Sequence, residues 1–235
     1  MYVLDTLAFR GAEPSGGCHV RPSPVLLRNP AAATGTEGQI RARTRRPSRR
    51  AARIPARFGT TRHWHKRIVR SGPHTLFPYQ ENPPDRTIQD DDIVFADFGP
   101  VFQDFEADLG RTYVLGDDPV KHRLAADLPV IFDAGRRLFA ADPAITGARL
   151  HAEIDRLARA AGWTLGGEHA GHLIGEFPHN KITTTNLDSY IAPGNTTPLR
   201  RTDHLGLTCH WILEIHLTTP THAFGGFHEQ LLDLD

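Results

Sequence analysis

Residues 92–115 of this chain, DIVFADFGPVFQDFEADLGRTYVL, decide how it is expected to fold. The runs Asp92–Phe98 and Ala107–Leu115 are rich in apolar, β-branched and aromatic residues, with a turn-like stretch between them. This pattern predicts two antiparallel strands. Asp97 and Asp108 then face each other across the pair, in apolar surroundings where a carboxylate is costly to bury unless a cation meets it.

Three more potential metal ligands follow along the chain. His172 lies in Gly-His-Leu-Ile-Gly, Glu214 in the apolar run Trp211–Leu217, and Glu229 in His-Glu-Gln-Leu-Leu. One histidine and four carboxylates suit hard or borderline divalent metals. Two such ions about 3.5–4 Å apart form the clamp used by several classes of hydrolase. The five residues together therefore predict a dinuclear metal site.

These motifs, in this order, resemble the pita-bread metallopeptidase family, which includes methionine aminopeptidases, Xaa-Pro aminopeptidases and prolidases. The resemblance rests on the Asp97-x-Gly…Asp108-x-x-Arg-Thr hairpin, the glycine-flanked His172 and the two late glutamates. It covers the chain from about Thr61 to the C-terminus. It implies the α+β pita-bread fold, in which helices flank a curved antiparallel sheet.

The resemblance also implies a role for each metal ligand. Asp97 would bind one metal through both oxygens, Asp108 and Glu229 would bridge the two metals, and His172 and Glu214 would complete the ligand set of the second metal. The implied cofactors are two divalent ions, which the sequence leaves open among Mn, Co, Fe and Zn.

The function that the resemblance implies is hydrolysis of a peptide bond, by an aminopeptidase or Xaa-Pro-type peptidase. Glu214 would carry the proton as general base and then acid, and His179 would donate a hydrogen bond to the substrate or the oxyanion. Two alternatives stay open: a non-catalytic pita-bread module that binds peptides, and an inactive truncated derivative. Among other histidines, His216 shares the strand face of Glu214, and we expect structural or solvent-facing roles for His63 and His65.

The chain departs from the family pattern at three places. Where family members often carry a substrate-contacting histidine, Pro78 stands here and His74 is offset. Ile215 rather than proline follows Glu214, which argues against a standard methionine aminopeptidase. Residues 1–57 show no amphipathic helical pattern, so we expect the family's N-terminal helices to be absent and a sheet face to be left uncovered.

The zero formal charge of the chain conceals an asymmetry. Residues 1–70 hold fifteen Lys and Arg against three acids, a net charge of +12, which leaves −12 on residues 71–235. We expect residues 1–57, rich in Arg, Pro and Ala, to be a disordered basic segment and residues 58–235 to form the catalytic domain. A mis-started or frame-shifted coding region is the alternative. A nucleic-acid partner is not expected, because no aromatic stacking platform accompanies the charge.

Further elements follow from periodicity and from capping signals. The sequence predicts helices over Pro119–Ala140, where Pro129 interrupts the pattern and introduces a kink, and over Thr146–Ala161, which Gly162 ends. Further strands are predicted over Gly171–Gly175, His210–Leu217 and Gln230–Leu234.

The composition narrows the class of protein. The hydrophobic content of 39% and the charged content of 23% suit a globular domain. The two isolated cysteines, Cys18 and Cys209, make no disulfide framework, so a cytoplasmic location is expected. No apolar run approaches the roughly 20 residues of a membrane span, and Met1–Pro14 lacks the features of a secretory signal. A small peptide is thus the expected partner, and a homodimer is left open.

Overall fold

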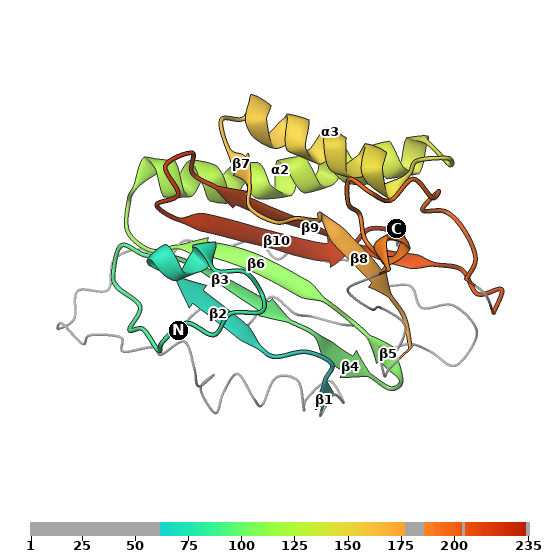
Figure 1. Cartoon of the computed structure of the whole chain (residues 1–235). Helices are drawn as coiled ribbons and strands as arrows, with labels where there is room; N and C mark the ends of the chain where they lie inside the picture. Colours follow the sequence, from blue (N-terminus) through green and yellow to red (C-terminus); the bar gives the residue numbers. More distant parts are fainter. Residues whose placement is uncertain (1–61, 177–185, 204, 234–235) are drawn as a thin grey trace, which may run out of the picture.

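One twisted antiparallel sheet forms the centre of the molecule (Figure 1). The computed structural model describes residues 62–176, 186–203 and 205–233. Within them, seven strands make up this sheet. In spatial order they are β2 (Ile68–Ser71), β3 (Ile93–Phe98), β6 (Leu109–Val114), β10 (Gly225–Leu231) and β9 (His210–Thr218), with β7 (Thr164–Leu165) and β8 (Gly171–Ile174) both paired to the outer edge of β9.

Two helices, α2 (Pro119–Ala141) and α3 (Gly147–Ala160), cover one face of the sheet (Figure 1). The ends of α3 lie within one residue of the prediction because local signals set them. The Thr146 side chain caps the first turn by accepting a hydrogen bond from the Arg149 amide, and Gly162 follows the helix with a φ of 84°. Neither helix of the described chain is long and apolar enough to cross a membrane.

Pro129 lies inside α2, on its solvent-exposed side. We expected a kink at this residue; α2 is a continuous helix through it, and the kink stays a prediction. Proline has no N–H to donate to the Ala125 carbonyl, so packing on the sheet has to hold this turn together. The buried residues of α2 that supply this packing are Leu124, Leu128, Ile131, Phe132, Gly135 and Phe139.

The side chains of strand β9 alternate between the two faces of the sheet. Its alternate residues Trp211, Leu213, Ile215 and Leu217 are fully buried in the core between sheet and helices. Because side chains alternate along a strand, Glu214 and the residues that share its phase point to the opposite face. The long apolar run of β9 thus places a carboxylate on the face that the helices leave open.

A second, three-stranded sheet lies at one end of the β3–β6 hairpin. It consists of β1 (Arg62–His63), β4 (Pro100–Phe102) and β5 (Phe105–Glu106). Residues 100–106, which the sequence suggested as a turn, thus form a short hairpin. Two 3-10 helices, η1 (Gly72–Leu76) and η2 (Leu187–Ser189), complete the described elements.

The predicted C-terminal strand was misplaced. We expected it over Gln230–Leu234, but β10 begins at Gly225 and ends at Leu231. The two glycines at its start are residues typical of a turn. In the structure they belong to the strand, and a Cβ on Gly226 would come within 2.5 Å of the Leu124 side chain. Gly226 therefore lets α2 approach the sheet closely. The expectations for residues 1–57, including the absence of N-terminal helices, lie outside the described residues.

Candidate metal centre

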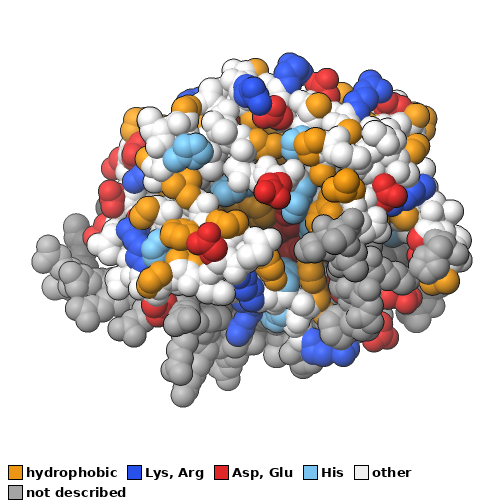
Figure 2. Space-filling model, in the orientation of Figure 1, with side chains coloured by type: hydrophobic (Ala, Val, Ile, Leu, Met, Phe, Trp, Pro, Cys, Tyr) orange, Lys and Arg blue, Asp and Glu red, His pale blue; other side chains and the backbone are white. Residues whose placement is uncertain are grey.

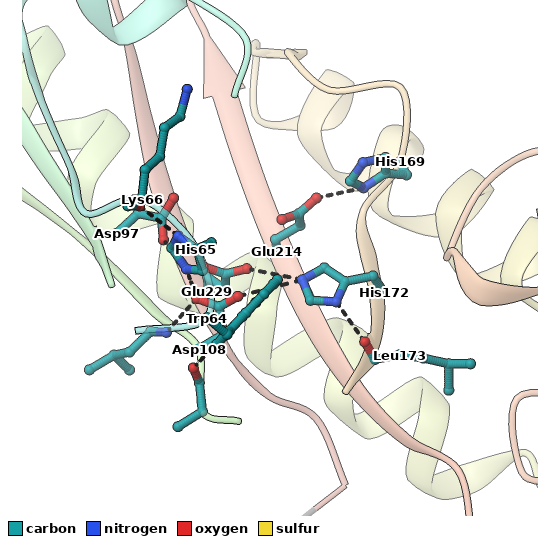
Figure 3. A network of polar contacts seen from close by, with 12 residues as sticks. Trp64, His65, Lys66, Asp97, Asp108, His169, His172, Leu173, Glu214 and Glu229 are labelled. Atoms are coloured by element: carbon teal, nitrogen blue, oxygen red, sulfur yellow. Dashed lines mark hydrogen bonds and ion pairs between the residues drawn. The ribbon is translucent and has the colours of Figure 1, made fainter. Parts of the chain in front are cut away.

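Three carboxylates lie at one level across the sheet, on the face away from the helices (Figure 3). The register pairs Asp97 of β3 with Gly110 of β6, Gly110 with Glu229 of β10, and Glu229 with Glu214 of β9. Residues directly opposite in a sheet point to the same side, so these acids share one face. A Cβ on Gly110 would come within 2.5 Å of the Phe227 ring, which is why this position in the row is a glycine.

Asp108 joins this row from one end of β6. We expected Asp97 and Asp108 to face each other, but Asp97 pairs with Gly110, two residues further along. The expected pairing was wrong because residues 100–106 form their own hairpin, which shifts the register. A shift of two residues preserves the face of the sheet, so Asp108 still points to the same side as Asp97.

Two histidines contact Asp108, one at each carboxylate oxygen (Figure 3). His65 Nε2 lies 3.1 Å from Oδ1, and His172 Nε2 lies 3.5 Å from Oδ2. The same nitrogen of His65 is 3.4 Å from Asp97 Oδ1, and that of His172 is 3.9 Å from Glu229 Oε1. Asp108 is thus the centre of a cluster that holds four of the five predicted ligands together with His65.

The cluster is buried, although a hollow at the middle of this face exposes acidic and histidine side chains (Figure 2). Asp97, Asp108, His172 and Glu229 are 2% to 8% exposed. Burial, and then the charge of Asp108, raises the pKa of Asp97 to about 8. The same two causes raise the pKa of Glu229 well above its usual value. Negative charge in this cluster is therefore short of positive partners.

The pKa values of the two histidines also rise, although burial alone would lower them. Burial opposes protonation of His172, but its hydrogen bond to Asp108 and the charge of Glu214 outweigh this and raise its pKa to about 9. His65 shows the same balance, with a raised pKa. The pKa of Asp108 falls despite burial, because both imidazoles hydrogen-bond to it. Protonated imidazoles thus replace some of the missing positive charge.

Glu214 lies at the edge of the cluster, because its carboxylate oxygen Oε1 is 2.6 Å from Nδ1 of His169 (Figure 3). Burial would raise the pKa of Glu214, but this hydrogen bond and the charges of His169 and His172 make the net shift downward. Glu214 is therefore an ionised carboxylate, held in place by a histidine that the prediction did not include. The spacing His169-x-x-His172 was the sequence signal that could have identified it.

The residues fit a pair of divalent cations. Asp97 Oδ1 and Glu229 Oε2 are buried and accept no hydrogen bond from the described residues. Potential ligand atoms of His65, Asp97 and Asp108 lie within 4.8 Å of one another, and so do those of Asp108, His172 and Glu229. Buried carboxylate oxygens without donors, beside imidazole nitrogens, are the ligands that Mn, Fe, Co and Zn accept.

The other predicted residues have different positions. His179 lies outside the described residues. His216 is on the expected face, but its Nε2 is 2.9 Å from the Thr75 carbonyl oxygen, to which it donates, so it links β9 to η1. Pro78 accepts a hydrogen bond from Arg70 through its carbonyl, and the neighbouring Tyr79 ring lies 6.0 Å from the His65 ring. His65, to which we assigned no role in the site, was missed.

Comparison with solved structures supports the expected fold. A prolidase from Thermococcus sibiricus is 23% identical, with a TM-score of 0.57 over 80% of this chain and 47% of its own. An X-Pro aminopeptidase from Thermotoga maritima is 21% identical, with a TM-score of 0.55 over 76% of this chain and 47% of its own. A methionine aminopeptidase from Thermotoga maritima is 16% identical, with a TM-score of 0.59 over 79% and 83%. These likenesses show the pita-bread fold.

The chain spans about half the length of the prolidase and of the X-Pro aminopeptidase. Comparison with curated proteins gives no match. The sequence pattern of Metallopeptidase family M24 matches residues 33–206. This match begins before the domain boundary expected after residue 57, and the boundary stays a prediction. Because the match covers well over half of the sequence, the chain belongs to metallopeptidase family M24.

Proposed function

We propose that this protein is a dinuclear-metal-dependent hydrolase that cleaves a peptide bond of a small peptide, as an aminopeptidase or Xaa-Pro-type peptidase. One observation carries the proposal: buried carboxylates of β3, of β10 and of Asp108, just before β6, converge on two histidines, and two of their oxygens accept no hydrogen bond from the described residues. Burying such charge is costly unless cations neutralise it.

The five residues of the sequence motif, Asp97, Asp108, His172, Glu214 and Glu229, would hold the ions. Bound there, two divalent ions would activate a water as nucleophile near neutral pH and polarise the scissile carbonyl. The identity of the ions stays open among Mn, Co, Fe and Zn.

Glu214 is the residue we assign to proton transfer. Its lowered pKa keeps it ionised, so that it can accept a proton from the attacking water and deliver it to the leaving nitrogen. The contact with His169 at 2.6 Å fixes the orientation of this carboxylate. Donation of a hydrogen bond to the oxyanion by His179 stays a prediction.

The substrate class rests on family membership and on one departure from the family pattern. Prolidases, an X-Pro aminopeptidase and methionine aminopeptidases share the fold. Ile215 after Glu214, instead of proline, makes a standard methionine aminopeptidase the less favoured choice. We therefore place dipeptides and Xaa-Pro peptides first. A cytoplasmic location and a homodimer remain predictions.

The test combines metal analysis with a substrate screen on the full chain. Protein loaded with Mn or Co, and then gel-filtered, should hold about two ions per chain. It should hydrolyse Xaa-Pro dipeptides or peptides with a free N-terminus. Asp108→Ala should abolish turnover and reduce the bound metal. Asp133→Ala, which removes a half-exposed carboxylate of α2 beside Arg136, should change neither.

Either of two results would contradict the proposal. Unchanged turnover in Asp108→Ala would rule out the mechanism. Near-zero metal in a folded, loaded sample would favour the non-catalytic peptide-binding module instead.

A further inference from the structure

Asp108 has one imidazole at each of its two oxygens, and only His172 belongs to the ligand set that the family resemblance implies. We propose that His65 is an additional ligand, which binds the same ion as Asp97. Each of the two ions would then have one imidazole, with Asp108 between them. This inference rests on the proposed dinuclear site and assigns a sixth residue to it.

The first support is the orientation of the two rings. His65 Nδ1 is 2.6 Å from the carbonyl oxygen of Lys66, and His172 Nδ1 is 2.7 Å from that of Leu173 (Figure 3). In each residue Nδ1–H can donate to the carbonyl of the next residue, which leaves Nε2 directed at the carboxylates. A histidine that ligates a metal is typically held in this way, because the hydrogen bond fixes both its tautomer and its ring.

The second support is the division of the ligand atoms into two groups that share Asp108. His65 groups with Asp97 and Asp108, and His172 groups with Asp108 and Glu229, with the atoms of each group within 4.8 Å of one another. A bridging carboxylate needs one ion near each of its oxygens. The nearest imidazole nitrogens, at 3.1 Å from Oδ1 and 3.5 Å from Oδ2, follow the same division.

The third support is the way the fold makes room for His65. Its side chain is only 4% exposed. The ring lies against Gly99, where a Cβ would come within 2.2 Å of the ring carbon Cδ2. The Trp64 ring packs edge-on at 4.5 Å between centroids. Gly99 follows Asp97 closely in the hairpin, so the glycine of this motif creates the space that the histidine of a distant segment fills.

A second imidazole changes which ions the site prefers. Carboxylates alone suit Mn, whereas imidazole favours Zn, Co and Fe. We therefore expect the ion beside His65 and Asp97 to be a borderline metal, and the His65 variants to lose affinity for Zn²⁺ or Co²⁺ more than for Mn²⁺.

The competing role for His65 is that of a counter-ion, protonated beside the carboxylates and not bonded to metal. Proton NMR of the full-length wild-type protein loaded with Co²⁺ separates the two roles. A histidine bound to Co²⁺ through Nε2 gives a strongly shifted, solvent-exchangeable Nδ1–H signal. We expect two such signals, from His65 and His172. A single signal in protein that holds two Co²⁺ ions would overturn the inference.

Variants provide the second measurement. Zn²⁺ titration by calorimetry should show two sites in the wild type, and one of them should weaken at least about tenfold in His65→Gln. Gly99→Ala, which displaces the ring without removing it, should weaken the same site. His63→Gln removes the neighbouring histidine of β1 and should leave both sites unchanged.

The outcomes separate the two proposals. Two Zn²⁺ affinities within twofold of the wild-type values in folded His65→Gln would refute the role of His65 and leave the dinuclear site standing. Wild-type protein that takes up no Co²⁺ or Zn²⁺ would refute both proposals. Circular dichroism establishes that each variant is folded, and the wild-type NMR result decides the question if His65→Gln does not fold.

Discussion

His228 and Glu229 are neighbours in β10 with opposite environments. Glu229 points to the carboxylate cluster, whereas the His228 ring packs 4.9 Å from the ring of Phe132 in α2. Burial, with a smaller contribution from the charge of Arg111, lowers the pKa of His228 to about 3. A neutral histidine is thus part of the packing between sheet and helix, which gives the stability of the domain a predictable dependence on pH.

The direction of this dependence follows from the depressed pKa. Below about pH 6.5 the unfolded chain binds a proton at His228 that the folded chain cannot accept, so stability is lost as the pH falls towards 3. The loss approaches about 1.4 kcal/mol per pH unit. His228→Phe should remove this contribution, which urea unfolding of metal-free protein between pH 7 and pH 5 would measure. As a control, His222→Gln, at an exposed loop position, should show the same dependence of stability on pH as the wild type. If His228→Phe also showed the wild-type dependence, the assignment to His228 would be wrong.

At the scale of the element, α2 contains a correctable defect. Pro129 is exposed, lies inside the helix and leaves the Ala125 carbonyl without its helical donor. Pro129→Ala should therefore raise the free energy of unfolding by roughly 1–3 kcal/mol. Denaturant unfolding measures this difference. Val130→Ala, at the exposed neighbouring position, should change it by less than about 0.5 kcal/mol. No gain in Pro129→Ala would mean that the helix geometry has adapted to proline.

The elements differ in how well the sequence alone predicts them. The bounds of α3 and β9 were confirmed to within one residue, because a cap, a terminal glycine and a long apolar run are local signals. The start of β10 was missed because Gly225 and Gly226 have no strand preference of their own. Their conformation comes from pairing with β9 and from close packing of Leu124, which are tertiary effects.

At the scale of the molecule, local sequence motifs identify the predicted site residues, whereas the residues that were missed reach the site through tertiary contacts. Asp97, Asp108, His172 and Glu229 occur in motifs with characteristic neighbours, and the structure brings them together. His65 has no such motif. It reaches the cluster only because the chain before β2 passes over the hairpin at Gly99. Such an approach depends on the path of the chain and not on local spacing.

Metal loading should stabilise the whole domain. The proposed ligands come from β3, β8, β9 and β10 and from the residue before β6, so bound ions would link most of the sheet. Each ion at a free concentration of 100 times its Kd should add about 2.7 kcal/mol to the free energy of unfolding. Thermal unfolding with and without Mn²⁺ or Co²⁺ would show the shift, which Asp108→Ala should abolish. An equal midpoint in both conditions would count against ions bound across the sheet.

The convergence of four strands, and of the residue before a fifth, on one buried cluster has a consequence for the lifetime of the protein in a cell. If bound ions stabilise the fold, a fall in the free metal concentration increases the fraction of molecules that are open and sensitive to proteases. The amount of protein would then depend on the metal supply, because the unloaded form is degraded faster, without any change in its rate of synthesis. If the proposed ions bind, the protein would be degraded under the same metal scarcity that leaves the site empty, so an unloaded site and a short half-life would occur together.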